Sequence, residues 1–368
     1  MKIIVASDSF KGTLTSLEAC EAIRDGILRA KPDADVRIYP MSDGGDGSLD
    51  VLQYYLSGET IDALATDPLG RRIATKWLKV GKRAYIEIAS ASGLNLIKNE
   101  LNPLYANTYG TGEMILEAVN SGCDEIYLLL GGSGTTDCGC GILNALGIDF
   151  MDSEDMTIRP SGGTLERFVR IDTSGIPENV RNSHFYLATD VSNLLLGKNG
   201  TARIYAPQKG ASCKDVDLLE RNLVVFVDLL IEITGKEIHT FEGSGAAGGI
   251  PVGILSFFEG AIISGYKLFK DVSGFLDELS DADLVITGEG KIDYQTFCGK
   301  LPYSIAQETK EAGVKCIAFC GVKGDNWERF ADTGVSVFSI LNDSSEPLPE
   351  EPHRELIKLA ETSIMDFI

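Results

Sequence analysis

The sequence predicts an α/β fold in which a doubly wound, parallel five-stranded sheet is interrupted by a second, inserted α/β domain. Two observations carry this prediction. Short apolar strands alternate with helical stretches over residues 1–60, and the same alternation returns from residue 284 to the end of the chain. Such alternation is typical of βαβ units and a parallel sheet. We therefore predict one domain from residues 1–62 plus 283–368 and an inserted domain from residues 63–282.

The front of the chain supplies two strands. Residues 3–6 are a short apolar run, which we interpret as a buried first strand rather than a secretion signal, whose apolar core is longer. Thr15 and Glu18 have the spacing of a capping box, which predicts the start of a helix. Residues 36–39 predict the second strand, and residues 48–56 predict the second helix.

The end of the chain supplies three more strands in the same alternating order. We expect strands at residues 284–287, 315–320 and 335–340, and helices at residues 302–312 and 352–367. Two strands from the front and three from the end complete the five-stranded sheet.

The segment between these two parts is long enough to form a domain of its own. Its expected strands are residues 84–88, 126–130, 184–188 and 202–205, and its expected helices are residues 110–121 and 215–234. We interpret it as an α/β insertion. The competing layout is two consecutive domains divided near residue 150 or residue 240.

Composition excludes several classes of protein. The 368 residues carry 33 Lys and Arg against 54 Asp and Glu, which gives a net charge of −21. Nucleic acids and anionic membranes require a basic surface, so neither is expected as a partner. No apolar run reaches the ~20 residues of a membrane helix. The eight cysteines contain no Cys-x-x-Cys pair, and we interpret them as reduced, with the protein in the cytoplasm.

The polar and glycine-rich loops follow predicted strands. These loops are residues 8–12, 42–47, 131–141 and 288–293. Ligands of open α/β sheets bind beyond the carboxyl ends of the strands. Because the chain enters and leaves the inserted domain, we also expect a cleft between two lobes. These positions favour an enzyme whose site lies in that cleft.

Two glycine-rich loops are candidates for binding phosphate. Residues 131–141 follow a predicted strand, and residues 243–249 form a second loop of small residues. Glycine lets backbone amides approach a ligand, and Ser and Thr hydroxyls add donors. No Gly-Lys-Ser/Thr follows the first loop, so it is not a Walker A loop. Close packing explains either loop as well, and both interpretations stay open here.

Charged residues at strand ends are candidates for the chemistry. Asp8 can accept a proton or bind a metal ion, and Lys11 can neutralise a carboxylate or a phosphate. Asp and Ser at strand ends also cap helices, so a purely structural role is the alternative for Asp8 and Ser9. The other acids at predicted strand ends are Asp43, Asp190, Glu289 and Asp293.

Ordered motifs run the length of the chain. They are residues 8–12 (DSFKG), 43–47 (DGGDG), 109–113 (YGTGE), 131–133 (GGS), 190–191 (DV), 207–211 (PQKGA), 245–249 (GAAGG), 287–293 (TGEGKID), 295–296 (QT) and 299–300 (GK). Together they resemble the glycerate kinase type 1 family, the two-domain bacterial glycerate kinases. The resemblance implies phosphorylation of D-glycerate that depends on ATP and Mg²⁺. It also implies a flavodoxin-like domain interrupted by a second α/β domain.

Phosphoryl transfer requires positioning and charge neutralisation, and on this basis we propose three groups of candidate site residues. The candidate catalytic residues are Asp8, Lys11, Asp43, Asp190, Glu289 and Asp293. The candidate nucleotide-binding residues are Gly131, Gly132, Ser133, Gly134, Thr135, Asp137, Gly245 and Gly248. Asp43 and Asp190 are the candidate ligands of Mg²⁺. Which acid accepts the substrate proton and which holds the metal is left open.

The sequence departs from the family pattern at several positions. Asp46 replaces a glutamate of the family, and residues 133–140 differ from its usual loop. The substrate is therefore less firmly implied than the reaction. We expect D-glycerate and ATP as the small-molecule partners, with 2-phosphoglycerate favoured over 3-phosphoglycerate as product, and a homodimer is compatible with the sequence. The alternatives are a kinase of another small hydroxy acid and a non-catalytic, bilobed protein that binds small acids.

Overall fold

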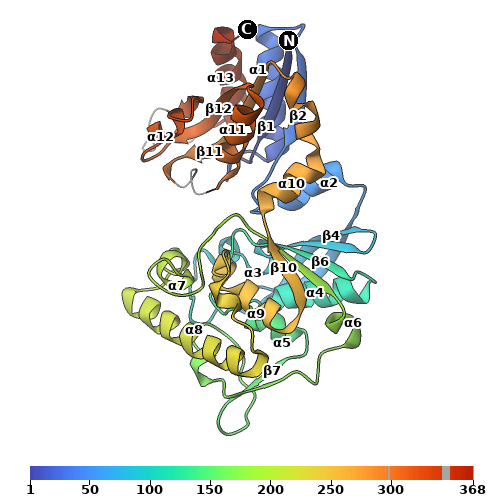
Figure 1. Cartoon of the computed structure of the whole chain (residues 1–368), viewed down its shortest axis with the longest axis vertical. Coiled ribbons are helices and arrows are strands. Elements are labelled where there is room, and N and C mark those ends of the chain that lie inside the picture. The colour runs from blue at the N-terminus through green and yellow to red at the C-terminus, as the bar shows by residue number, and fades with distance from the viewer. Residues whose placement is uncertain (295, 297–298, 342–348, 368) are drawn as a thin grey trace. The chain divides into compact units, whose positions relative to one another are not determined.

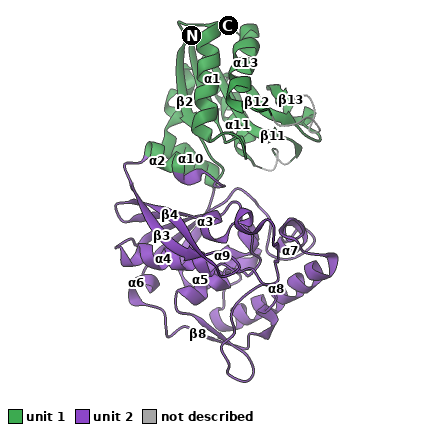
Figure 2. Cartoon of the chain, turned by 180° about the vertical axis from the view of Figure 1, so that it is seen from behind, with its two compact units in different colours: residues 1–43, 50–55, 265–368 green, residues 44–49, 56–264 purple. Residues whose placement is uncertain are grey.

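The protein is described from a computed structural model of residues 1–294, 296, 299–341 and 349–367. The chain forms two compact units (Figure 2). Unit 1 consists of residues 1–43, 50–55 and 265–368, and unit 2 consists of residues 44–49 and 56–264. These ranges differ from the predicted domains at three places, because residues 44–49 and 56–62 belong to unit 2 and residues 265–282 belong to unit 1. Gln295, part of one motif, lies outside the described residues.

Unit 1 contains the predicted five-stranded parallel sheet (Figure 1). Its strands are β1 (Lys2–Ser7), β2 (Asp35–Pro40), β11 (Leu284–Ile292), β12 (Lys315–Lys323) and β13 (Ser336–Leu341). They lie in the order β13-β12-β11-β1-β2 and all pairs are parallel. This is the flavodoxin-like order. Since β1 pairs with β11, the competing layout of two consecutive domains is wrong.

Helices cover both faces of this sheet. α1 (Ser16–Ala30) begins after Thr15, and the capping box between Thr15 and Glu18 is present as predicted. α1 packs against α13 (Pro352–Ser363), where a side chain at Gly26 would clash with the Ile357 carbonyl. α11 (Leu301–Ala312) covers the opposite face (Figures 1 and 2). The remaining helices in this part of the chain are α2 (Ser48–Tyr55), α10 (Gly265–Ser273) and α12 (Glu328–Ala331).

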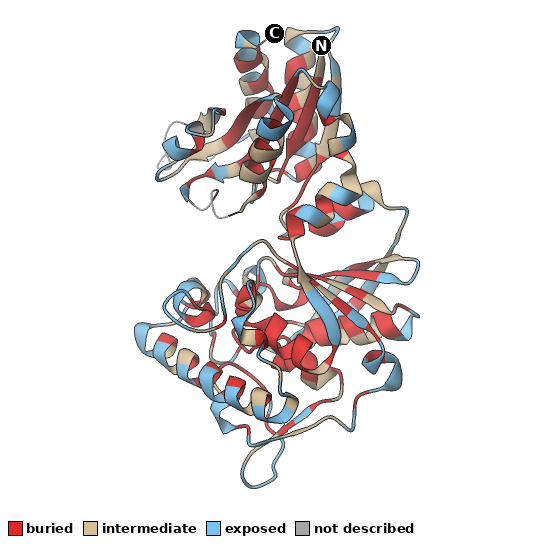
Figure 3. Cartoon of the chain, in the orientation of Figure 1, coloured by how far each residue is buried: buried red, intermediate tan, exposed pale blue. Residues whose placement is uncertain are grey.

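The interior strands β1, β11 and β12 of unit 1 are largely buried (Figure 3). Alternate residues of these strands form one apolar cluster with α1 and α13: Ile3, Val5, Leu284, Ile286, Ile317 and Phe319. Strands buried on both faces have near-continuous apolar sequences, which is why they were recognisable from sequence alone.

Unit 2 contains a mixed six-stranded sheet in the order β10-β9-β6-β5-β4-β3. Its strands are β3 (Glu59–Thr66), β4 (Arg72–Val80), β5 (Arg83–Glu87), β6 (Glu125–Leu129), β9 (His184–Ala188) and β10 (Glu259–Ile263). The predicted strands at 84–88, 126–130 and 184–188 are confirmed. β3 and β4 were not predicted, because in this antiparallel hairpin irregularly spaced charged residues interrupt both the apolar runs and the regular alternation that indicate a strand.

One predicted strand of the insertion is wrong. Residues 202–205 belong to α7 (Thr201–Tyr205). Ala202 and Ala206 are fully buried whereas Ile204 is exposed, which is the helical spacing of four rather than the alternation of a strand. The two predicted helices are confirmed as α4 (Tyr109–Asn120) and α8 (Cys213–Thr234).

Shorter elements complete unit 2. They are the hairpin strands β7 (Asp149–Met151) and β8 (Arg170–Asp172) and the helices α3 (Ala89–Ser92), α5 (Cys140–Ala145), α6 (Glu178–Arg181) and α9 (Ile250–Phe257). Across the described residues of both units, no helix is long and apolar enough to span a membrane.

Candidate active site

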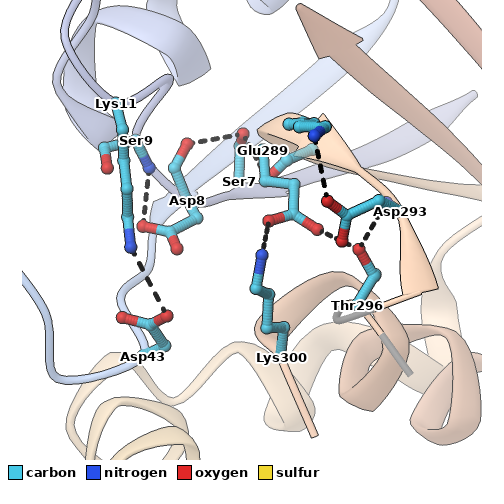
Figure 4. Close-up of polar contacts among 11 residues, drawn as sticks. Ser7, Asp8, Ser9, Lys11, Asp43, Glu289, Asp293, Thr296 and Lys300 are labelled. Atoms are coloured by element: carbon cyan, nitrogen blue, oxygen red, sulfur yellow. Dashed lines mark hydrogen bonds and ion pairs between the residues drawn. The ribbon is translucent and has the colours of Figure 1, made fainter. Parts of the chain in front are cut away.

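Asp8 follows β1 directly and lies at the carboxyl edge of the unit 1 sheet (Figure 4). It is 5% exposed, and its Oδ1 accepts the backbone N–H of Ser9 at 2.6 Å. Burial and the nearby Asp43 carboxylate raise the pKa of Asp8 to about 8, although the Lys11 ammonium opposes the shift. Asp8 is therefore a carboxyl group that can take up or release a proton near neutral pH.

Lys11 and Asp43 form an ion pair next to Asp8. The Lys11 Nζ lies 3.9 Å from the Asp43 Oδ2 (Figure 4), and most of the lysine side chain is exposed. Lys11 comes from the loop after β1, and Asp43 from the loop after β2. The neighbouring carboxyl ends of two parallel strands thus supply a cation and two acids to one place.

A second polar group forms at the end of β11. Glu289 is 6% exposed, and its carboxylate accepts the Thr296 hydroxyl at 2.7 Å and the Lys300 ammonium at 3.2 Å (Figure 4). Burial raises the pKa of Glu289, and Lys300 and Thr296 counteract the rise. The backbone N–H of Asp293 donates to the same Thr296 hydroxyl, and the Asp293 carboxylate lies 3.4 Å from Lys291 Nζ.

The unit 1 sheet brings five of the six candidate catalytic residues to one edge. Lys11 and Asp43 form an ion pair, the charges of Lys11, Asp43 and Glu289 act on Asp8, and the Asp43 charge also acts on Glu289. Thr296 and Lys300 complete the group. Sequence reasoning had not placed Thr296 or Lys300 among the site residues, although both lie in quoted motifs.

A cavity of about 280 Å³ adjoins this group inside unit 1. Its polar lining comes from Ser9, Lys11, Glu289, Lys291 and Lys300. Its apolar lining comes from Phe10, Val322, Ile340, Leu341, Pro349 and Pro352, with Thr13, Gly290 and Gly321 completing the wall.

Asp190, the sixth candidate, lies in unit 2. It follows β9, is half-buried, and its Oδ1 accepts the Ser264 hydroxyl at 2.7 Å. The two candidate Mg²⁺ ligands, Asp43 and Asp190, therefore belong to different units. Their convergence with Lys11, and the cleft in which they would meet, stay predictions.

In unit 2, internal hydrogen bonds occupy much of the glycine-rich loop after β6. The amide of Gly131 donates to the Gly44 carbonyl at 3.0 Å, and the amide of Gly134 donates to the Ser92 carbonyl at 2.8 Å. A side chain at Gly132, which has φ +71°, would overlap the Asp46 carboxylate. These contacts favour the packing interpretation for the glycines of this loop.

Asp137 stabilises this region from inside. It is fully buried, and its carboxylate accepts the amides of Thr108, Gly139 and Gly141 together with the Thr108 hydroxyl. It thereby links the start of α4 to the start of α5. This is the geometry of a structural carboxylate rather than of a nucleotide ligand.

Lys209 was not predicted as a site residue, yet it connects the same loop to the rest of unit 2. It is 2% exposed, and its Nζ donates to the Ser133 hydroxyl at 2.8 Å and to the Thr135 carbonyl at 2.6 Å. Burial lowers the pKa of Lys209 to about 7, although the Asp137 charge opposes the shift. Its motif, residues 207–211, was the available signal.

Gly245 and Gly248 lie in close backbone contacts. The Gly245 amide donates to the Asn193 carbonyl, and its own carbonyl accepts the Thr201 hydroxyl. A side chain at Gly248 would overlap the Thr135 carbonyl. Here too the structure favours packing over ligand binding.

The carboxylates of this edge are the available donors for a metal ion. Among the residues that the structure describes, no group of three or more His, Cys, Asp and Glu is arranged to hold a metal ion. Mg²⁺ in kinases needs only one or two carboxylates besides phosphates and waters. Because the Asp43 charge raises the pKa of Asp8, a bound cation would relieve the repulsion between these acids. Asp8 and Asp43 thus supply the number of carboxylates that Mg²⁺ takes, whereas Asp190 lies in unit 2 and its role as a ligand stays a prediction.

Comparison with known proteins agrees with this architecture. The glycerate kinase family profile matches residues 3–366. A glycerate kinase from Halalkalibacterium halodurans is 38% identical over 92% of this chain and 90% of its own length. A glycerate 2-kinase from Escherichia coli is 35% identical over 93% of this chain and 91% of its own length. The crystal structure of a candidate glycerate kinase 2 from Salmonella typhimurium LT2 superposes with a TM-score of 0.81 at 32% identity, over 98% of this chain and 96% of that one.

The family match spans nearly the whole chain, and each of the two relatives aligns over about nine-tenths of this chain and of its own length. The structural neighbour shares both units rather than one of them. The chain therefore belongs to the glycerate kinase family and is a kinase.

Proposed function

We propose that this protein transfers the γ-phosphoryl group of ATP to a hydroxyl of D-glycerate and gives 2-phosphoglycerate rather than 3-phosphoglycerate. Family membership supports glycerate as substrate, and the Escherichia coli relative named glycerate 2-kinase supports the position. The observation that carries the mechanism is the meeting of Asp8, Lys11 and Asp43 at the carboxyl ends of β1 and β2.

Asp8 is the proposed general base. A base works best when its pKa lies near the working pH, and burial brings the pKa of Asp8 to about 8. In its ionised form Asp8 accepts the proton that the substrate hydroxyl loses as its oxygen attacks phosphorus.

Lys11 and Lys300 supply positive charge for the transferring phosphoryl group. Phosphoryl transfer requires of the protein mainly positioning and charge neutralisation. Glu289, fixed by Thr296, holds the Lys300 ammonium in place. Asp43 and Asp190 are the proposed ligands of Mg²⁺, which when bound would neutralise charge on the phosphates of ATP.

The protein is also proposed to act in the cytoplasm. Seven cysteines lie in the part of the chain that the structure describes, all of them are unpaired, and six of these are buried. Unpaired buried thiols fit a reducing compartment. A homodimer stays a prediction.

The test is an assay that follows ADP release with D-glycerate, L-glycerate, lactate and tartrate as acceptors, with the phosphorylated product resolved by ³¹P NMR. We expect turnover with D-glycerate and a 2-phosphoglycerate signal. Release of 3-phosphoglycerate would overturn the proposed position of phosphorylation and leave the proposed substrate in place. Turnover confined to another hydroxy acid would establish the alternative of a kinase for that acid.

A further inference from the structure

The cavity of unit 1 has two chemically different ends. Its lining follows the sheet edge from β13 to the loop after β1. Ile340 and Leu341 come from β13, Val322 comes from β12, and Pro349 and Pro352 lie before and at the start of α13. This end is apolar.

The other end of the cavity is charged. Lys291 comes from β11, Lys300 precedes α11, and Lys11 comes from the loop after β1. The carboxylates that pair with them are Asp293, Glu289 and Asp43, respectively. Through Lys11, this end lies next to the Lys11–Asp43 ion pair.

The floor between the two ends is backbone. Gly290 and Gly321 lie side by side in β11 and β12, and a Cβ on Gly321 would fall 2.6 Å from the Gly290 carbonyl oxygen. A Cβ on Gly290 would lie 3.1 Å from the Lys11 amide nitrogen. Glycine at both positions lets β11, β12 and the loop after β1 pack closely together at the floor of the cavity.

A three-carbon hydroxy acid does not match this cavity. Glycerate has a carboxylate and two hydroxyls but no apolar surface to cover six apolar side chains. The volume of about 280 Å³ is close to the lower limit of the ~300 to 1,000 Å³ that drug-sized ligands occupy. A flat heterocyclic base joined to a chain of phosphates has the required division into an apolar part and an anionic part.

We propose that this cavity binds the nucleoside triphosphate, with the base between the β12 and β13 residues and the phosphates along Lys291, Lys300 and Lys11. The reacting phosphoryl group then lies at the Asp8 end. The proposal rests on ATP being the phosphoryl donor, and it places the nucleotide in unit 1 instead of on the glycine-rich loops of unit 2. The Gly131 and Gly134 amides of those loops already donate to backbone carbonyls.

The test fills the apolar end. Val322→Trp places a large side chain into the cavity, and Val322→Ala at the same position leaves the space open. We expect Val322→Trp to weaken binding of ADP at least about tenfold, measured by titration calorimetry on the full chain without glycerate. In the assay it should raise the KM for ATP and leave the KM for D-glycerate unchanged. Val322→Ala should retain both values within a few-fold.

A second filling variant, Leu341→Trp, guards against misfolding, and thermal unfolding of each variant verifies the fold. Unchanged ADP affinity in both folded tryptophan variants would overturn the proposal. A rise in the KM for D-glycerate alone would also overturn it, because the cavity would then hold the acid. Loss of ADP affinity in Ser133→Ala but not in Val322→Trp would return the nucleotide to unit 2.

The test of the nucleotide cavity can succeed or fail independently of the test of the proposed reaction. ADP binding is measured without an acceptor, so the cavity can be confirmed even if D-glycerate is not the substrate. Conversely, D-glycerate phosphorylation can persist in a Val322→Trp variant whose ADP affinity is unchanged.

Discussion

The Lys300 ammonium lies 3.2 Å from the Glu289 carboxylate, and this ion pair joins the end of β11 to the start of α11. Glu289 is almost fully buried, whereas Lys300 retains partial exposure. The pair therefore keeps a buried negative charge compensated while presenting the ammonium to the cavity.

Removing one member of this pair should cost stability. Lys300→Met leaves the Glu289 carboxylate buried without its cation, and we expect a loss of roughly 1–3 kcal/mol in the free energy of unfolding. The double variant with Glu289→Gln should recover most of that loss, because neither charge remains. Urea unfolding measures both. A single variant as stable as the wild type would show that the pair contributes nothing to folding.

Lys11 should matter for turnover and not for folding. It is mostly exposed, so Lys11→Ala should leave the melting temperature nearly unchanged. Loss of a group that stabilises transition-state charge commonly costs about a hundredfold or more in rate. The matched control is Lys310→Ala, an exposed lysine on α11 away from the cavity lining. Equal rates for the two variants would remove Lys11 from the mechanism.

Asp190 should be required for its charge. Asp190→Asn keeps an oxygen that can accept the Ser264 hydroxyl, so the fold should persist while kcat falls about a hundredfold. Ser264→Ala removes that hydrogen bond and retains the carboxylate, and its effect should be much smaller. If Asp190→Asn has near wild-type kcat, Asp190 is neither the base nor a metal ligand.

Asp8 should make stability fall as pH rises. Its pKa is about 8 in the folded protein and 3.8 when unperturbed, so between these values the folded state binds more protons than the unfolded state. The free energy of unfolding must then decrease with pH across this window and level off above about pH 8. Asp8→Asn lacks the titration, so its melting temperature should exceed that of the wild type most at pH 8 and least near pH 4. A constant difference would contradict the raised pKa.

Lys209 should make the free energy of unfolding rise with pH, which is the opposite of the effect of Asp8. Its pKa is about 7 in the folded protein against 10.5 when unperturbed, so between these values the unfolded state binds more protons. Its contribution to stability should therefore increase from about pH 7 toward pH 10. Melting temperatures of the wild type and Lys209→Met over this range measure the effect. Parallel curves would mean that Lys209 titrates normally.

Local patterns determined much of the fold in advance. The buried strands of unit 1, the capping box at Thr15 and the long helix α8 all follow from apolar runs and helical spacing, which act over a few neighbouring residues. The hairpin of β3 and β4 does not follow from such patterns, because few of its residues are buried and its charged residues interrupt the apolar spacing.

For the site, the positions of Asp8, Asp43 and Glu289 at predicted strand ends indicated that they would lie at one sheet edge. The chemistry of these residues depends on tertiary contacts. A raised pKa at Asp8 requires burial and the Asp43 charge, and the roles of Lys209 and Lys300 require partners 76 and 11 residues away. The glycine-rich loops illustrate the same point. Their composition predicts phosphate binding, but long-range hydrogen bonds occupy the Gly131 and Gly134 amides. The burial of a side chain, the electrostatic field that it feels and its hydrogen-bond partners depend on residues that are distant in sequence but close in the folded protein. A short stretch of sequence does not contain this information.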